Sequence, residues 1–529
     1  MNAQSTRHCL RLGLSDAAMI DRRAVGFRLA GAAAGLMLAG PSMWGTLAPL
    51  QAVALLPILY CDAALRVKRP VVFLAGMYMG LAYTVPQICY LRMPPVITVV
   101  LLVYFTALMI LLVAGWRVLA LRSTVWGAAA AGTFFAVMDW VNVVALPMWG
   151  TSQSFVRCWS RYPRWITFTS ATGLAGIAFV LAALQALAVL AVVRPRAWRR
   201  CLAMAAVIIA AAGVLNVVAA QGRAQTHMKV AAVGWLSSDS SDCPDVHSAD
   251  GFETLFAGPV AEAAAQGARL IVSGEMGFFM DGQTRAEWFG RFGEISRRHG
   301  VYLAVGYLDA GLNENRLVFF DPRGQVAGYY TKTHLTPFEH SRPGDRRLTI
   351  VDVDGVGIGA VICQDDNFTD LVRDYGRRRV GVMAVPTLDW STVRSVHLET
   401  TIHRAIQLRQ PIVRAAINGI SAIILPSGEV AARCDHFRDG PKMIIAEVPV
   451  VARPTLYARW GDWPVVLCLA YLAFYLGRCH RRQAPHVANE NLRVDPANSE
   501  SDLSSCHSRE RGNPGPARPG QPFVPSQAK

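Results

Sequence analysis

Three polar residues end apolar, strand-like runs in the second half of the chain, and their types together suit nucleophilic catalysis. Glu275 ends ARLIVSGE, Lys332 follows VAGYYT, and Cys363 ends GAVIC. A thiol that attacks an acyl group needs a base for its proton and a donor for the oxyanion that forms. A carboxylate can serve as the base, while a lysine ammonium stabilises the oxyanion and favours the thiolate. The three side chains therefore form a chemically complete set.

A purely structural interpretation competes with this one. A lone cysteine at the end of an apolar strand usually packs as a small hydrophobic residue. Glu275 could cap a loop, and Lys332 could be solvated. Ligands of α/β sheets, however, bind at the carboxyl ends of strands. Because all three residues lie at such predicted ends, we favour Cys363 as a nucleophile.

The segment that must position these residues, 228–452, alternates strand-like and helix-like patterns. Runs such as ARLIVSGE, VYLAVGYLD and VGVMAVPT are typical of strands, and residues 284–299 and VHLETTIHRAIQLRQ are typical of helices. VGIGAVICQDD is predicted to be one strand with Cys363 near its end, and PIVRAAINGISAII is predicted to be a strand pair. Strand–helix alternation with added hairpins predicts a layered α/β domain.

Apolar residues are concentrated outside this segment. Of the 529 residues, 53% are hydrophobic and only 17% are charged, which is unusually apolar for a soluble protein. Most apolar runs before residue 221 approach or exceed the roughly 20 residues that cross a bilayer. The first run has no cleavage motif after it, so we expect it to be a retained helix. The expected spans are 24–40, 44–60, 70–91, 96–116, 124–146, 166–193 and 199–220.

Basic residues between the runs predict how the spans are oriented. Arg22, Lys68, Arg117 and Arg196 mark four positions on one side of seven spans, and positive loops face the cytoplasm. The segment that carries the three chemical residues then lies outside the cytoplasm. The loop 147–165 breaks the rule, because it also holds three arginines. Either these face lipid head groups on the outer side, or the count of spans is off by a pair.

The expected organisation is completed by the two ends of the chain. Trp460 and Trp463 resemble an interfacial belt before a final span. The composition of the last fifty residues is typical of a disordered tail. The predicted parts are a cytoplasmic N-terminus at 1–23, a membrane domain at 24–220, a soluble domain at 228–452, a junction with a final span at 453–480, and a cytoplasmic tail at 481–529.

Charge and cysteine content exclude several classes of function. The net charge of +15 comes largely from arginines in the membrane loops rather than from a basic stripe with aromatics, so we do not expect nucleic-acid binding. The eleven cysteines have no C-x-x-C spacing, which argues against a zinc site or a dense disulfide framework. One pair, Cys243 and Cys434, lies in the outer domain and could form a disulfide in an oxidising compartment.

The order Glu275, Lys332, Cys363 resembles the Glu–Lys–Cys triad of the nitrilase superfamily, in which each residue lies near a strand end. More narrowly, the chain resembles the apolipoprotein N-acyltransferase family, with seven spans, a periplasmic nitrilase domain and an eighth span. The motifs that carry the resemblance are YTKTHLTPFEH, TLYARWGDWP, MWGTSQ and HRAIQLRQPIVRAAINGISAII. The resemblance implies a helical membrane domain joined to an α/β domain of the αββα sandwich type.

The resemblance also implies a ping-pong reaction without metal or organic cofactor. Cys363 would take an acyl chain from a phospholipid as a thioester, and the N-terminal amine of a lipidated apolipoprotein would then accept it. Glu275 would be the general base and Lys332 the oxyanion partner. The supporting residues would be Glu339 as an additional active-site glutamate, Gln364 through its backbone N–H as second oxyanion donor, Asp365 beside it, and Asp389 and Trp390 in a loop next to the site.

The same resemblance places the protein in the bacterial inner membrane, with its catalytic domain on the periplasmic side, and we expect a monomer. Two alternatives stay open. A membrane-tethered nitrilase-type hydrolase would use water in place of the amine as the second acceptor. A catalytically silent relative would bind lipoprotein or lipid without turning it over.

Overall fold

The computed structural model describes residues 21–481, apart from residues 66, 121–123, 147, 221–223, 225, 238–243, 338 and 452. Cys243 therefore lies outside the described residues, as do almost all of the predicted N-terminal and C-terminal cytoplasmic segments. The predicted disulfide and the two tails stay predictions.

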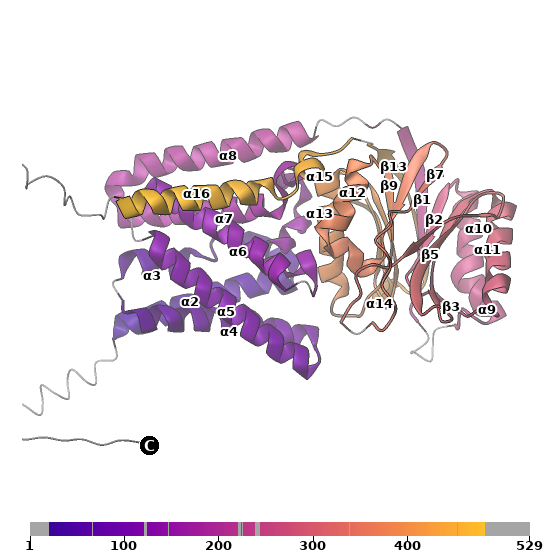
Figure 1. The fold of residues 1–529 in the computed structure, drawn as a ribbon, viewed down its shortest axis with the longest axis horizontal. Helices are drawn as coiled ribbons and strands as arrows, with labels where there is room; N and C mark the ends of the chain where they lie inside the picture. The colour runs from indigo at the N-terminus through magenta and orange to yellow at the C-terminus, as the bar shows by residue number, and fades with distance from the viewer. Residues whose placement is uncertain are drawn as a thin grey trace, which may run out of the picture. The chain divides into compact units, whose positions relative to one another are not determined.

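Within the described residues, eight helical segments are long and apolar enough to cross a membrane. Seven precede residue 221 and one follows the soluble segment, in the apolar runs that the sequence indicates. In chain order they are α2 (Arg22–Met43), η1 (Gly45–Ala52) with α3 (Leu56–Ala64), α4 (Arg69–Leu91), α5 (Pro95–Ala120), α6 (Val125–Ala145), α7 (Thr169–Val193), α8 (Trp198–Ala220) and α16 (Trp463–Arg481). These helices run side by side in Figure 1.

The soluble segment contains two β-sheets. One has the strand order β13-β1-β2-β4-β5-β6, with β3 paired to β4, and the other has the order β12-β11-β10-β9-β8-β7. The strands are β1 (Thr226–Gly234), β2 (Leu270–Ser273), β3 (Phe278–Met280), β4 (Tyr302–Asp309), β5 (Glu314–Phe320), β6 (Val326–Thr331), β7 (Ile350–Val353), β8 (Val356–Ala360), β9 (Val382–Leu388), β10 (Ile412–Ile417), β11 (Ile420–Ile424), β12 (Val430–Asp435) and β13 (Lys442–Val450).

The sheets pack face to face, and helices cover their outer faces (Figure 1). Val230 of one sheet and Val382 of the other belong to the buried core between the sheets. The helices α9 (Ala249–Phe252), α10 (Gly258–Ala265) and α11 (Arg285–His299) cover the first sheet. The helices α12 (Thr369–Arg377) and α13 (Arg394–Leu408) cover the second. This order of layers confirms the predicted αββα sandwich.

The side chains of β9 show why its sequence suits this arrangement. Successive residues of a strand point to opposite faces. Val382 and Ala384 therefore enter the core between the sheets, while Met383 and Val385 pack beneath α12 and α13. Both faces of the strand are buried, which explains why it is apolar throughout rather than alternating.

Several elements differ from the sequence prediction, and the short strands β3 and β7 are among those that it missed. The predicted strand VGIGAVICQDD ends at Ala360, and Cys363 instead begins the 3-10 turn η7 (Cys363–Asn367) with a positive φ of 48°. The sequence analysis also missed β13, which pairs antiparallel with β1 along its whole length. A positive φ and a pairing across more than two hundred residues are both consequences of tertiary structure, so local patterns do not reveal them.

Candidate active site

The predicted base and lysine meet at the carboxyl ends of their strands. Glu275 lies two residues beyond β2, and Lys332 follows β6 directly. The Lys332 ammonium donates to Glu275 Oε1 at 2.7 Å and to Glu339 Oε2 at 2.6 Å. Asn315 at the start of β5 donates from Nδ2 to both carboxylates, at 2.7 and 2.8 Å. The structure therefore joins Glu339 to the predicted pair and adds Asn315, which the sequence analysis missed.

These contacts hold Lys332 in its charged form. Its side chain is only 1% exposed. Burial alone would lower the pKa of the amine, but the negative charges around it, Glu275 above all, outweigh burial and raise the pKa above its usual value. The site consequently keeps a buried cation where an oxyanion partner is needed.

Cys363 is linked to Glu275 through one residue, Leu388. The Leu388 N–H donates to Glu275 Oε2 at 2.6 Å, and the Leu388 carbonyl accepts from Cys363 Sγ at 3.6 Å. Burial, followed by the charge of Glu275, raises the pKa of the Cys363 thiol well above its usual value, and Lys332 offsets this only in part. Lys332 thus favours the thiolate as expected, but the net effect of the surroundings is the opposite, and they favour the protonated thiol of Cys363.

Cys363 lines a pocket with a cavity volume of about 100 Å³. Its wall on the soluble side includes Cys363, Gln364, Leu388, Asp389 and Trp390. Its other wall is made by the membrane helices α2, α4 and α5 and by the loop that follows α6, through Ser42, Met43, Tyr83, Gln87, Tyr90, Leu91, Leu101, Phe105, Trp149, Ser152, Gln153 and Arg157. A mostly apolar cavity that Cys363 lines suits a substrate with a long apolar part.

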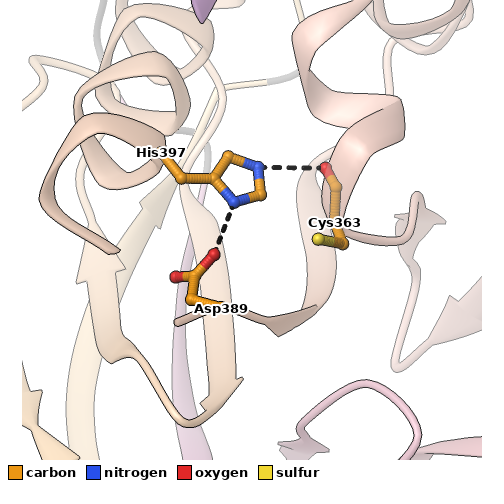
Figure 2. Close-up of side chains that lie close together, drawn as sticks. All are labelled: Cys363, Asp389 and His397. Atoms are coloured by element: carbon orange, nitrogen blue, oxygen red, sulfur yellow. Dashed lines mark hydrogen bonds and ion pairs between the residues drawn. The ribbon is translucent and has the colours of Figure 1, made fainter. Parts of the chain in front are cut away.

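A second polar group in the pocket wall, His397 with Asp389, lies beside Cys363 (Figure 2). His397 of α13 places Nδ1 2.8 Å from Asp389 Oδ1 and Nε2 3.3 Å from the backbone oxygen of Cys363. Asp389 also accepts from Arg414 of β10 at 2.6 Å, and all three side chains are buried. Sequence analysis had singled out Asp389 but not its two partners. The available signal was an arginine inside β10, which is otherwise apolar, whereas His397 lies in a helix that also holds Glu399 and Arg404.

Asp365 does not line the pocket. Its side chain instead stabilises the backbone around the site. Its carboxylate is fully buried and accepts from Tyr330 Oη at 2.7 Å, from the N–H of His334 at 2.6 Å and from the N–H of Thr333 at 3.2 Å. These bonds tie the turn that starts at Cys363 to the loop that starts at Lys332. The nucleophile and the lysine therefore keep a defined separation.

Gln364 connects the nucleophile turn to the membrane domain. Its side chain donates from Nε2 to the carbonyl of Met148 at 2.6 Å and accepts from Asn367 Nδ2 at 2.9 Å. Two residues of the same outer loop reach the turn as well. Thr151 donates to the carbonyl of Asn367 at 3.0 Å, and Ser152 donates to its Oδ1 at 2.9 Å. The loop that carries the MWGTSQ motif is thus bonded to the turn that carries the nucleophile.

This contact gives a first prediction. Replacing Gln364 with leucine leaves the Met148 carbonyl and the Asn367 amide without partners, and buried polar groups that lose partners cost about 1–3 kcal/mol. We expect that loss in the free energy of unfolding, measured with denaturant on detergent-purified protein. The exposed Gln283, changed to leucine, is the matched control and should leave stability unchanged. Equal stability of the two variants would contradict the prediction.

The presence of arginines in the loop 147–165 is explained by contacts between this loop and the soluble domain. Arg157 pairs with Glu399 of α13 at 3.1 Å, and Arg161 pairs with its other oxygen at 3.3 Å. Only Arg164 is largely exposed, beside Glu429 at 3.9 Å. The proposal that all three arginines face lipid head groups is therefore wrong for Arg157 and Arg161. Their charge is balanced by Glu399. The structure has seven helical segments before residue 221, which is the number of spans that the sequence analysis expects.

Residues 210–455 match the family model described as carbon–nitrogen hydrolase. The matched residues include the two-sheet sandwich and the buried side chains of Glu275, Lys332 and Cys363, so this part of the chain is similar to carbon–nitrogen hydrolases.

Among curated proteins, the chain is similar to the apolipoprotein N-acyltransferase of Geobacter metallireducens. The two are 29% identical over 195 residues, which is 32% of this chain and 37% of that one. It is also similar to the apolipoprotein N-acyltransferase of Bradyrhizobium diazoefficiens, with 29% identity over 236 residues and 40% of each chain covered. These matches span about two fifths of the length of each relative. The resemblance that the sequence motifs indicate is thereby confirmed.

Among solved structures, an amidase from Nesterenkonia sp. is similar, with 20% sequence identity and a TM-score of 0.37. The match covers 50% of this chain and 98% of that one.

Proposed function

We propose that the protein transfers an acyl chain from a phospholipid, through a thioester on Cys363, to the N-terminal amine of a diacylglyceryl-cysteine apolipoprotein. The observation that carries this proposal is the shape of the pocket. Cys363 lines a cavity whose other wall comes from membrane helices, which places the thiol beside a space suited to a lipid acyl chain. The reaction would take place in the bacterial inner membrane, with the soluble domain on the periplasmic side.

In the first half-reaction, Glu275 takes the proton of the Cys363 thiol, and the sulfur attacks the ester carbonyl of the phospholipid. The oxyanion that forms is stabilised by the Lys332 ammonium and by the backbone N–H of Gln364. The bond to the glycerol oxygen then breaks, and that oxygen receives the proton from Glu275. The products are a thioester on Cys363 and a lysophospholipid.

In the second half-reaction, the neutral amine of the apolipoprotein attacks the thioester carbonyl. The carbon–sulfur bond breaks, Glu275 takes a proton from the amine, and the sulfur of Cys363 regains it. The charged form of Lys332 supports this sequence, because a cation beside the base is available in both steps. Glu339 and Asn315 hold Lys332 and Glu275 in place through the four bonds described above.

The test measures the thioester directly. Purified protein is incubated with phospholipid, and intact mass should show an acyl adduct that Cys363→Ala abolishes. Cys434 is buried in the same domain but outside the pocket, so Cys434→Ala is the matched control and should keep the adduct. A competent phospholipid that leaves no adduct on the wild-type protein would overturn the proposal.

A second experiment, in which an acceptor is added, distinguishes acyl transfer from hydrolysis. Adding a diacylated lipopeptide with a free N-terminal amine should give a triacylated peptide, and the same peptide with a blocked amine should give none. Free fatty acid in place of triacylated peptide would instead support a membrane-tethered hydrolase.

A further inference from the structure

His397 faces hydrogen-bond acceptors on both sides of its ring (Figure 2). Burial would raise the pKa of Asp389, but Arg414 and His397 outweigh it and hold the pKa below its usual value, so this carboxylate is ionised and only accepts. The other partner, the backbone oxygen of Cys363, can also only accept. The contact with Cys363 is therefore a hydrogen bond only if Nε2 of the His397 ring donates to the carbonyl.

Charged side chains surround this cluster. Glu275, Glu339 and Asp389 are acidic, and Lys332 and Arg414 are basic. Two residues further along α13, Glu399 is paired separately with two arginines of the outer loop.

The same three residues, Cys363, Asp389 and His397, lie close enough together to suggest a metal site. Their hydrogen bonds argue against it. One oxygen of Asp389 is bonded to the His397 ring and the other to the buried Arg414, so neither is available without breaking a buried ion pair. The cluster is better understood as a support for the backbone of Cys363.

We infer that His397 is a positioning residue that sets the orientation of the oxyanion-hole donor, an inference that rests on the proposed function. The carbonyl of Cys363 and the N–H of Gln364 belong to one planar trans peptide group and point in opposite directions. A hydrogen bond from His397 to that carbonyl therefore fixes the direction of the Gln364 N–H. Within the described residues this N–H has no hydrogen-bond acceptor, and Gln364 lies in the pocket wall.

The conformation of Cys363 explains why such support is needed. Its φ of 48° is in the left-handed region, which costs a non-glycine residue of order 1 kcal/mol and persists only when the surroundings hold it. The carbonyl is held by His397, and His397 is held in turn by Asp389 and Arg414. Without this chain of contacts, the peptide group between residues 363 and 364 is free to rotate, and the donor turns away from the oxyanion.

The test compares two reactions of the same sulfur. Acylation of Cys363 by a p-nitrophenyl ester passes through an oxyanion and releases p-nitrophenolate. Alkylation by iodoacetamide forms a carbon–sulfur bond and releases iodide without an oxyanion. In His397→Leu, we expect acylation to be about 100-fold slower, as for loss of one oxyanion donor. Alkylation, measured by peptide mass at Cys363, should keep its wild-type rate.

Two further variants distinguish positioning from a general structural role. His397→Gln can still donate an amide N–H to the Cys363 carbonyl, so it should restore part of the acylation rate. His403 is buried on the same helix and also contacts a backbone carbonyl, that of Arg157 at 2.7 Å. His403→Leu should therefore lose stability while keeping the wild-type ratio of the two rates.

Equal losses of acylation and alkylation in His397→Leu, or no loss of acylation, would overturn the inference. A wild-type protein that reacts with the p-nitrophenyl ester but forms no adduct from phospholipid would overturn the proposed function and leave this inference standing.

Discussion

Replacing Glu275 with glutamine is expected to slow formation of the acyl adduct on Cys363 by about a hundredfold to ten-thousandfold, the usual contribution of a general base. The reason is the protonation state of the nucleophile. Burial keeps the pKa of the Cys363 thiol well above its usual value, so almost no thiolate exists at neutral pH without a base. The adduct is measured by intact mass at short incubation times, with protein in phospholipid.

The pH dependence gives this prediction a second, independent readout. The variant can react only through the small fraction of Cys363 that is spontaneously ionised, and below a raised pKa that fraction grows about tenfold for each pH unit. The wild-type protein uses the carboxylate and has no such requirement. The ratio of variant rate to wild-type rate should therefore rise steeply between pH 7 and pH 9, by up to about tenfold per unit.

Glu339→Gln is the matched comparison for this variant. Glu339 also bonds to Lys332 and Asn315, but the bond from the Leu388 N–H goes to Glu275. Its replacement weakens the support of Lys332 while leaving the base in place, so the loss of rate should be smaller and the rate ratio should not climb with pH. An equal loss in both variants, with no rise with pH in Glu275→Gln, would show that Glu275 holds the lysine rather than taking the proton.

The residues that sequence analysis located share one property, which is that their signal is local. Glu275 and Lys332 follow strand-like runs, and strand ends are visible in a short window of sequence. Cys363 was located for the same reason, although its strand ends earlier than predicted, at Ala360. Glu339 follows within seven residues of the lysine that it contacts. The layered α/β fold could be predicted because its strands and helices alternate regularly along the chain.

The residues that were missed depend on partners that are remote in the sequence. His397 is one buried residue of a helix, and its importance comes from Asp389 and the carbonyl of Cys363, which are brought beside it by the folding of β9 and η7. Arg414 lies in a strand buried along its length and gives no sign of its bond to Asp389. Composition and periodicity give information about the helix or strand to which a residue belongs. They do not predict contacts between residues of different elements.

The arginines of the outer loop are visible in the sequence, but their role depends on partners that are remote in the sequence. Counting basic residues predicts orientation only when they are solvated, because the rule reflects the cost of moving exposed charge across the membrane. Arg157 is buried and paired, so it does not report orientation in this way. The exception in the loop 147–165 is instead evidence of a contact with the soluble domain, and Glu399 is the residue through which Arg157 and Arg161 take part in it.

Replacing Glu399 with alanine is accordingly expected to have the largest effect on stability, about 3–5 kcal/mol, because it leaves two arginines without a counter-charge. The Glu399 and Arg157 side chains are 3% and 6% exposed, so little solvent is available to replace the lost partner. We expect the loss in denaturant unfolding of the detergent-purified protein. The acyl adduct should fall with it, because Arg157 and its neighbours form part of the pocket wall.

An exposed pair between the same loop and the soluble domain is the matched control. Arg164 and Glu429 are 3.9 Å apart, with side chains 85% and 58% exposed, and such a pair contributes about 0–1 kcal/mol. Glu429→Ala should therefore leave stability and adduct formation close to the wild-type values. In a double-mutant cycle, Arg157→Met should cost less in the Glu399→Ala background than alone, since the partner is already gone. Additive losses would mean that the two side chains act independently, and that the loop is held to the soluble domain by other contacts.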